Sequence, residues 1–414
     1  MSGEVSNDLL VDIFERLPPK SVIQLRSLSK YWHSRIATPE FVRNYNLRHS
    51  KNPDQKVLIR HLTYCGNYEF KDIYTLHDGD QLPLDPGSGY TGIPGVEFPH
   101  GTKQIIGSCN GILCLQDNRN NICLWNVSIR RELIVPSCPL KSSSHTISGF
   151  GFDPIAYDYK VVAIPYSTCY KSHENNNTFI YSLKTDSWSR IPSPSSRFYN
   201  MKSEKACFFN GILHWVVEGY VNKLSTEDPK DHTWSCFILT LDLSTCVFGH
   251  IVFRTNWRIK QLTTVNGCLT VVCLGLGSWE GGDCWIMTMK EYGNTESWCK
   301  LYKLDIKEAF DLVKVLQLPV RSDGGDLVAY YEGSKVYNPE TKMETKVLKF
   351  GPYCFNLEME AYVGSLELLD KERATTCGET IFSWTKEDNN KRLRLSQDDD
   401  DDDDGECSVL NYTF

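Results

Sequence analysis

From about residue 100 onward the sequence repeats one pattern, and this repeat constrains the fold more than any other feature. Each unit is a short apolar run that ends in a polar turn and resumes as a second apolar run. The turns lie near Asn126, Ser182, Asp242, Thr288 and Asn338, at successive offsets of 46 to 60 residues. A period of this length favours an architecture built from similar units of about four strands each.

A second recurring element lies before three of these turns. Asn-Gly stands at residues 110–111, 210–211 and 266–267, each time between apolar runs. Asn and Gly tolerate the positive φ angles that the tight turn of a β-hairpin needs. The C-terminal part is therefore predicted to be antiparallel β-structure, and the period near 50 residues favours a kelch-like β-propeller of about six blades. A distorted β-sandwich is the alternative, because the repeat is irregular.

The first 48 residues show the periodicity of short amphipathic helices instead. Apolar residues at positions 9, 10, 13, 14 and 17 recur at intervals of three and four, and Ser6 or Asn7 is placed to cap this helix before Pro18-Pro19 ends it. A second helix is expected from Ser21, and a third that carries Trp32 and Ile36 before Pro39 closes it. Three such helices are too few to bury their apolar faces among themselves, so they need a partner surface.

Residue identities in this segment are more specific than its periodicity. Ile-Phe-Glu-Arg-Leu-Pro-Pro-Lys-Ser at residues 13–21, followed by Lys-Tyr-Trp at 30–32 and Pro39, resembles the F-box motif. The usual Leu-Pro at its start is replaced by Val5-Ser6. The resemblance implies binding to the Skp-type adaptor and, through it, the cullin of an SCF (Skp, Cullin, F-box) ubiquitin ligase. The positions that match the adaptor-binding and packing residues are Leu9, Ile13, Leu17, Pro18, Ser21, Leu25, Lys30 and Trp32.

The β-rich part resembles the F-box associated domain of plant F-box proteins, in the group that includes S-locus F-box proteins and defence-regulating F-box receptors. The matching segments are residues 107–114, 125–130, 149–154, 158–162, 181–188 and 289–298. The resemblance implies a small all-α F-box module followed by an all-β, kelch-like propeller domain. It also implies that the propeller captures a target protein for ubiquitination and proteasomal degradation.

These patterns divide the chain into four parts. We predict an F-box helical module at residues 1–48, a linker with first strands at 49–99, and the F-box associated β-propeller-like domain at 100–385. Residues 386–414 read as a disordered tail, because the Asp run at 398–404 repels itself and does not pack.

Charge and cysteine usage restrict the partners and the compartment. Eight of the 52 acidic residues follow residue 397, and the remaining 44 equal the 44 Lys and Arg, which argues against nucleic-acid binding. The 16 cysteines are diluted through apolar runs, which favours buried reduced thiols. Neither a signal peptide nor an apolar run of about 18 residues is present, so we expect no membrane segment and a cytoplasmic or nuclear location.

The sequence gives no motif for a cofactor, a metal or a catalytic centre. Gly-Ser-Gly-Tyr-Thr-Gly at residues 87–92 lies among prolines, where no helix follows to hold a phosphate. The histidines lack metal-ligand spacing, and His214 in an apolar run is expected to be a core residue. We therefore expect a non-catalytic receptor subunit rather than an enzyme.

Two classes of function follow from these observations. The first is the substrate receptor of a ubiquitin ligase, whose loops at residues 222–234 and 276–283 present Trp234 and Trp279 to a target protein. The commoner role of such tryptophans is in the core or at blade junctions. The second class is a β-propeller enzyme or small-ligand-binding protein in which the N-terminal helices are only a structural cap.

Overall fold

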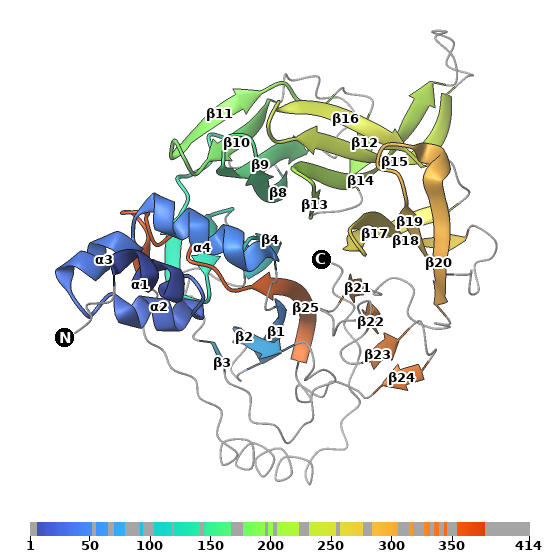
Figure 1. Ribbon diagram of the computed structural model, residues 1–414. Helices are drawn as coiled ribbons and strands as arrows, with labels where there is room; N and C mark the ends of the chain where they lie inside the picture. The colour runs from blue at the N-terminus through green and yellow to red at the C-terminus, as the bar shows by residue number, and fades with distance from the viewer. Residues whose placement is uncertain are drawn as a thin grey trace, which may run out of the picture.

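The computed structural model places a small group of helices beside an all-β domain, which confirms the predicted fold class (Figure 1). The structure describes residues 6–51, 55–64, 70–78, 92–93, 103–117, 120–140, 145–166, 177–194, 198–201, 205–222, 232–253, 257–275, 284–304, 314–317, 327–331, 335–338, 343–345 and 354–376. The tail predicted at residues 386–414 lies outside these ranges.

Four α-helices form the N-terminal module within the described residues. They are α1 (Asn7–Phe14), α2 (Pro19–Leu25), α3 (Lys30–Ile36) and α4 (Pro39–Lys51). Ser6 caps α1, because its side-chain oxygen accepts a hydrogen bond from the Leu9 amide at 3.3 Å. Ser29 caps α3 in the same way through the Trp32 amide at 3.2 Å.

Two prolines stand at the first position of a helix. Pro19 is the first residue of α2, which was expected to begin at Ser21. Pro39 was expected to close the third helix, and α3 does end before it, at Ile36; Pro39 also begins a fourth helix, α4, which was not predicted. Proline suits the first turn of a helix because the amide hydrogen that it lacks has no partner there.

The described strands form six antiparallel sheets. Sheet 1 contains β25 (Cys354–Val363), β1 (Gln55–Tyr64), β2 (Phe70–Asp78) and β3 (Gly92–Ile93). Sheet 2 contains β4 (Lys103–Cys109), β5 (Ile112–Asp117), β6 (Ile122–Asn126), β7 (Arg131–Ile134) and β26 (Thr375–Thr376). Sheet 3 contains β8 (His145–Asp153), β9 (Asp158–Tyr166), β10 (Thr178–Ser182) and β11 (Ser187–Ile191).

The other three sheets follow along the chain. Sheet 4 contains β12 (Phe198–Met201), β14 (Ile212–Asn222), β15 (His232–Asp242) and β16 (Val247–Val252), and β13 (Cys207–Phe209) also pairs with β14. Sheet 5 contains β17 (Trp257–Val265), β18 (Cys268–Gly275), β19 (Cys284–Met289) and β20 (Trp298–Leu304). Sheet 6 contains β21 (Lys314–Gln317), β22 (Leu327–Tyr331), β23 (Lys335–Asn338) and β24 (Met343–Thr345). A 3-10 helix at Thr295–Ser297 precedes β20.

The inner strands of the six sheets close into a ring. Strand β4 neighbours β8, β8 neighbours β13, β13 neighbours β17, β17 neighbours β21, and β25 lies between β21 and β4. The ring is completed by chain segments far apart in sequence, because β25 pairs with β1 from Gln55↔Val363 to Thr63↔Cys354. This radial arrangement is that of a β-propeller, and it excludes the alternative of a β-sandwich.

The core of the domain lies between neighbouring sheets. One cluster joins Cys114 and Leu124 of sheet 2 to Val161 and Tyr181 of sheet 3. Similar clusters join sheets 3 and 4 and sheets 4 and 5.

The free thiols of the described residues include Cys109, Cys114, Cys123, Cys273 and Cys284, all buried. Burial raises the pKa of the Cys207, Cys273 and Cys284 thiols to about 12, which keeps them protonated and unreactive.

The repeats found in the sequence correspond to equivalent places in the sheets. Asn126, Ser182, Asp242 and Asn338 are the last residues of the third strands β6, β10, β15 and β23. The three Asn-Gly pairs connect first strands to second strands, and both residues of each pair have positive φ, as at Asn110 (48°) and Gly111 (78°). Each turn therefore marks one sheet, as the repeat predicts.

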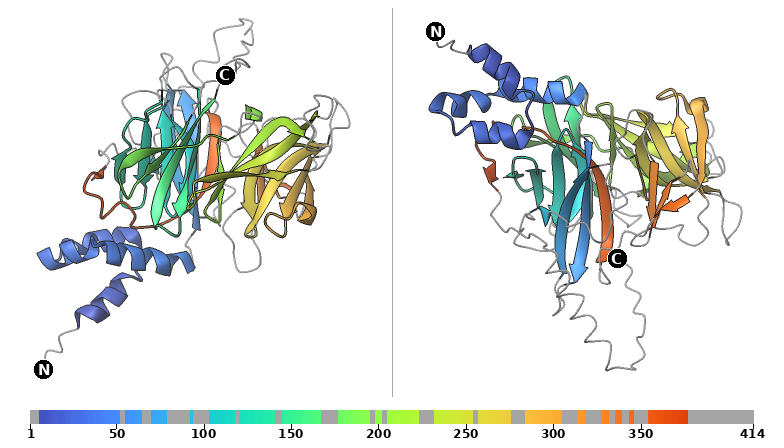
Figure 2. Two further views of the ribbon diagram at one scale, coloured as in Figure 1. Left: turned by 90° about the horizontal axis from the view of Figure 1, so that it is seen from above. Right: turned by 60° about the horizontal axis from the view of Figure 1, so that its bottom comes forward.

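The helices lie together beyond one end of the strands of sheets 1 and 2, and α1 begins on the side away from the sheets (Figure 2). Strands β1, β2 and β3, which precede residue 100, belong with β25 to sheet 1 of the propeller. No helix within the described ranges is long and apolar enough to cross a membrane.

Candidate adaptor-binding and target-binding surfaces

Helix α1 has one face packed in the module and one face exposed. Phe14 is buried against Trp32, with ring centroids 4.7 Å apart in an edge-to-face arrangement. Leu9 and Ile13 lie one turn apart on α1, and they are 52 % and 41 % exposed. Exposed apolar side chains at this spacing form a stripe that suits contact with another protein.

Ion pairs hold α1 in the orientation that exposes this stripe. The Asp12 carboxylate on α1 accepts hydrogen bonds from Arg16 and from Arg48 of α4, each at 2.7 Å. Hydrogen bonds from Arg48 and Arg16 lower the pKa of Asp12. The pair with Arg48 thus connects α1 to α4.

The other predicted positions of the F-box differ in exposure. Pro18 and Lys30 are exposed, whereas Leu17, Ser21 and Leu25 are half-buried. Leu17 and Leu25 pack against the helical core, and Trp32 lies inside it. The structure therefore gives Trp32 a packing role and leaves Leu9, Ile13, Pro18 and Lys30 on the surface.

Two further apolar residues between the end of α2 and the end of α3 are exposed and were not predicted. Leu28, between α2 and α3, is 61 % exposed, and Tyr31 of α3 is 51 % exposed. The Tyr31 ring lies edge-on to Trp32, with centroids 5.0 Å apart. In the sequence Leu28 lies between two serines and Tyr31 follows Lys30, and these polar neighbours are the available signal of exposure.

The propeller has two ends, and one of them adjoins the helices. Val363 of β25 pairs with Gln55 of β1 just after α4, so this end of sheet 1 faces the module. The β4–β5 turn lies at the same end, since a Cβ on Gly111 would meet Ser365 Oγ at 2.4 Å. We call it the helix-side end. Because strand directions alternate, connections from second to third strands leave at the opposite end, the loop-side end.

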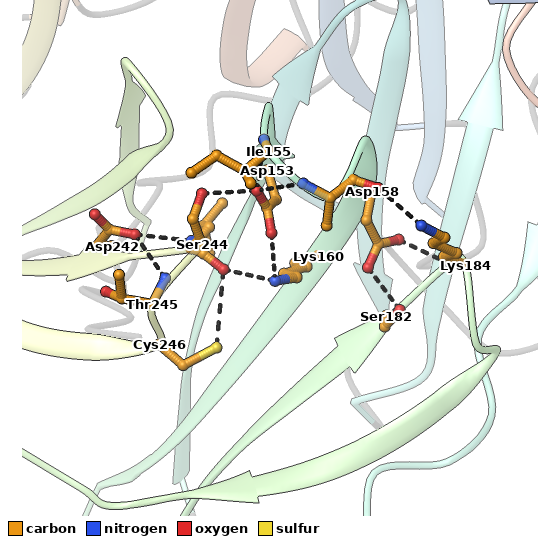
Figure 3. A network of polar contacts seen from close by, with 12 residues as sticks. Asp153, Ile155, Asp158, Lys160, Ser182, Lys184, Asp242, Ser244, Thr245 and Cys246 are labelled. Atoms are coloured by element: carbon orange, nitrogen blue, oxygen red, sulfur yellow. Dashed lines mark hydrogen bonds and ion pairs between the residues drawn. The ribbon is translucent and has the colours of Figure 1, made fainter.

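The turns at the helix-side end are fixed by polar contacts between sheets 3 and 4 (Figure 3). The buried Asp153 carboxylate accepts hydrogen bonds from Lys160 Nζ and Ser244 Oγ, both at 2.7 Å. Lys160 also donates to the Leu243 carbonyl at 2.6 Å. Burial acts to raise the pKa of Asp153, but the hydrogen bonds from Lys160 and Ser244 outweigh it and lower that pKa to about 2.

His214 is a satisfied core residue, as expected from the sequence. Its ring is fully buried, with Nδ1 3.1 Å from the Cys207 carbonyl and Nε2 2.8 Å from the Tyr292 hydroxyl. Burial lowers the pKa of His214 to about 4. Both ring nitrogens are engaged, so this histidine connects β13 and β14 of sheet 4 to the turn that follows β19 in sheet 5.

The predicted target-binding loops leave from the loop-side end. Strands β14 and β15 pair as far as Asn222↔His232, and residues 223–231 connect them there. Trp234 was expected in a loop, but it lies in β15 opposite Tyr220, because the hairpin continues for eleven residues on each strand. Residues 276–283 connect β18 to β19 at the same end, and Trp279 lies outside the described residues.

The helices and the propeller together define a two-part protein, with a helical module that exposes an apolar stripe and a large β domain that presents connections on its far end. The chain belongs to the family of F-box proteins with a C-terminal propeller: residues 4–44 match the F-box domain, and residues 96–348 match the F-box associated beta propeller domain. The strands of sheet 1 lie outside the second match.

Several curated proteins of Arabidopsis thaliana are similar to this chain. An F-box/kelch-repeat protein is 27 % identical over 80 % of this chain and 86 % of its own length. F-box protein CPR1 is 26 % identical over 71 % of each chain.

Among solved structures, the tricorn protease matches with a TM-score of 0.39 and 8 % identity, over 73 % of this chain and 31 % of its own. An oligogalacturonate lyase in complex with manganese matches with a TM-score of 0.34 and 12 % identity, over 71 % of this chain and 73 % of its own. At this level neither similarity supports an inference about function.

Proposed function

We propose that this protein is the substrate-recognition subunit of an SCF-type ubiquitin ligase. The exposed pair Leu9 and Ile13 within the F-box match is the observation that carries the proposal. This stripe binds the Skp-type adaptor and, through it, the cullin. The connections at the loop-side end bind a target protein, which is then ubiquitinated and degraded by the proteasome.

In this function the chain itself carries out no chemistry. Holding a target lysine beside a charged ubiquitin carrier raises its effective concentration, so that transfer becomes nearly intramolecular. The ligase's other subunits supply the reactive groups. The free, buried thiols of the propeller suit a reducing compartment, and we propose that the protein acts in the cytoplasm, the nucleus or both.

Adaptor binding is tested by co-purification of the full chain with a Skp-type adaptor. The variant Leu9→Asp/Ile13→Asp places charges in the stripe without touching the helical core, and we expect it to lose the adaptor. Leu47→Asp is the matched control, because Leu47 is 48 % exposed on α4 and lies beyond the F-box match. This control should retain the adaptor. Failure of the unmodified chain to retain it would contradict the proposal.

Target binding at the loop-side end is tested by proximity labelling in cells with the proteasome inhibited. Replacement of residues 223–231 and 276–283 by short Gly-Ser connections should remove a subset of labelled proteins while the adaptor remains bound. An unchanged set of labelled proteins would show that another surface captures the target.

A further inference from the structure

The helical module and the propeller share a core through residues 364–369, which follow β25. We call these residues the joint segment. Leu366 is fully buried and Leu369 nearly so, and both lie in one cluster with Val22, Ile36 and Phe41 of the helices. The apolar surface that the short helices need is thus supplied by a segment more than 300 residues further along the chain.

On the helix side, Asn46 of α4 holds the joint segment with both ends of its amide. Its Nδ2 donates to Glu367 Oε1 at 2.8 Å. Its Oδ1 accepts from the Leu366 amide at 3.0 Å. Glu367 is only 6 % exposed, so the contact lies in a region where a lost partner leaves a buried polar group unsatisfied.

On the propeller side, Asn126 at the end of β6 has the same role. This side chain is fully buried, and its Nδ2 donates to the Glu367 carbonyl at 2.8 Å and to Ser365 Oγ at 3.0 Å. Its Oδ1 accepts from the Ser128 amide at 3.0 Å. Asn126 and Asn46 therefore bind Glu367 from opposite sides, one through its backbone and one through its side chain.

The covalent connections between the two parts lie next to each other. Three residues separate α4 from β1, and β25 runs directly into the joint segment. Because β1 and β25 are hydrogen-bonded neighbours, the chain enters and leaves the module at one place on sheet 1. Rotation of the helical module about this place requires the hydrogen bonds of Asn46 and the packing of Leu366 to break together.

We propose that the joint segment fixes the angle between the F-box helices and the propeller, and that Asn46 and Glu367 are positioning residues for ubiquitin transfer. This inference rests on the proposed function. A fixed angle holds the adaptor-binding stripe and the loop-side end at a constant separation, so that only lysines within a limited zone reach the ubiquitin carrier. Loosening the joint widens that zone without changing either binding surface.

The inference is tested with Asn46→Ala and the matched control Asn44→Ala, which alters an exposed residue of the same helix. In hydrogen exchange on the full chain, we expect the amides of α4 and of the joint segment to exchange about tenfold faster in Asn46→Ala only. The amides of β18 and β19, which pair with each other in sheet 5, should be unchanged. Equal exchange in both variants would overturn the inference.

A second measurement addresses transfer itself. The full chain is assembled with the Skp-type adaptor, a cullin, ubiquitin and its activating and carrier enzymes, and the receptor lysines that become modified are mapped by mass spectrometry. Asn46→Ala should bind the adaptor as tightly as the unmodified chain and yet show additional modified lysines on the propeller. An unchanged set of lysines would contradict a positioning role.

A paired substitution separates positioning from folding. In Asn46→Asp the two carboxyl groups face each other, and the joint should loosen. Adding Glu367→Gln restores the hydrogen bond with its direction reversed, because the glutamine amide now donates to the aspartate carboxylate. The double variant should therefore recover both slow amide exchange and the original set of modified lysines. Absence of recovery would count against a direct interaction between Asn46 and Glu367.

If the unmodified chain fails to bind the adaptor, the proposed function is contradicted. The hydrogen-exchange experiment still tests the joint segment in that case.

Discussion

Lys160 and Asp153 form a buried ion pair that connects two sheets of the propeller. Lys160 Nζ lies 2.7 Å from Asp153 Oδ2, and the Asp153 side chain is 2 % exposed. Lys160 also donates to the Leu243 carbonyl of sheet 4, so one ammonium group joins the β8–β9 turn to the β15–β16 turn. Asp153 and Lys160 lie in two segments that resemble the family, residues 149–154 and 158–162, and their ion pair holds these two segments together.

Removal of this lysine should destabilise the propeller. Lys160→Met keeps most of the side-chain volume but leaves the Asp153 carboxylate buried without its cation, which is expected to cost about 3 kcal/mol of unfolding free energy. The nearby Lys184→Met serves as control, because Lys184 is exposed and should change stability by less than about 0.5 kcal/mol. Urea unfolding followed by tryptophan fluorescence measures both. Similar losses in the two variants would contradict the role of the pair.

Glu367 should make stability depend on pH. Burial raises the pKa of Glu367 to about 7, and the opposing effect of hydrogen bonds to Tyr159 and Asn46, which lower it, is smaller. Between pH 4.5 and 7 the folded protein holds this proton and the unfolded chain has released it, so stability falls as pH rises through that window. The decrease amounts to up to about 3 kcal/mol.

The variant Glu367→Gln isolates this contribution. Glutamine retains an acceptor for Asn46 but does not titrate, so unfolding free energy should decline less between pH 5 and pH 8 than in the unmodified chain. Urea midpoints at the two pH values provide the measurement. Parallel declines in both proteins would assign the pH dependence to other groups.

Local turn chemistry explains why much of the propeller was predicted from sequence. At Asn110-Gly111, Asn210-Gly211 and Asn266-Gly267, the required positive φ angles select residue types that are visible without a structure. The closing strand was not predicted. Pairing of β1 with β25 joins segments about 300 residues apart, and such pairing leaves no pattern in neighbouring residues.

The candidate sites also divide into residues identified by a local motif and residues brought together only by the fold. Leu9 and Ile13 were identified because their spacing and residue types match a short motif, whereas Asn46 and Asn126 are ordinary polar residues until the fold brings Glu367 between them. The fourth helix was not predicted because a proline that ends one helix and a proline that begins the next look alike in sequence. Trp234 was placed in a loop because the full length of the β14–β15 hairpin is set by register, not composition.

Two adjacent aromatic residues of the F-box should differ in their roles. Trp32→Ala removes a ring from the helical core and should destabilise the module by about 3 to 5 kcal/mol. Tyr31→Ala truncates an exposed ring and should leave stability nearly unchanged while weakening adaptor binding. Helix content measured by circular dichroism, together with adaptor affinity measured by calorimetry, distinguishes the two. A stable Trp32→Ala variant with weak binding would instead make Trp32 a direct contact.

Gly111 should be the least replaceable of the hairpin glycines. Gly111 and Gly267 both have positive φ, 78° and 68°, so alanine at either position incurs the left-handed penalty of about 1 kcal/mol. Only at Gly111 does the added Cβ also collide, since the Val363 carbonyl oxygen would lie 2.5 Å away, whereas nothing lies within 4 Å at Gly267. Gly111→Ala should therefore lower the thermal midpoint of unfolding by much more than Gly267→Ala does.

The same substitution should affect the joint segment. Since Val363 leads into the joint segment, Gly111→Ala should also speed amide exchange in α4, and Gly267→Ala should not. Equal effects of the two substitutions would mean that the β4–β5 turn does not bear on the joint.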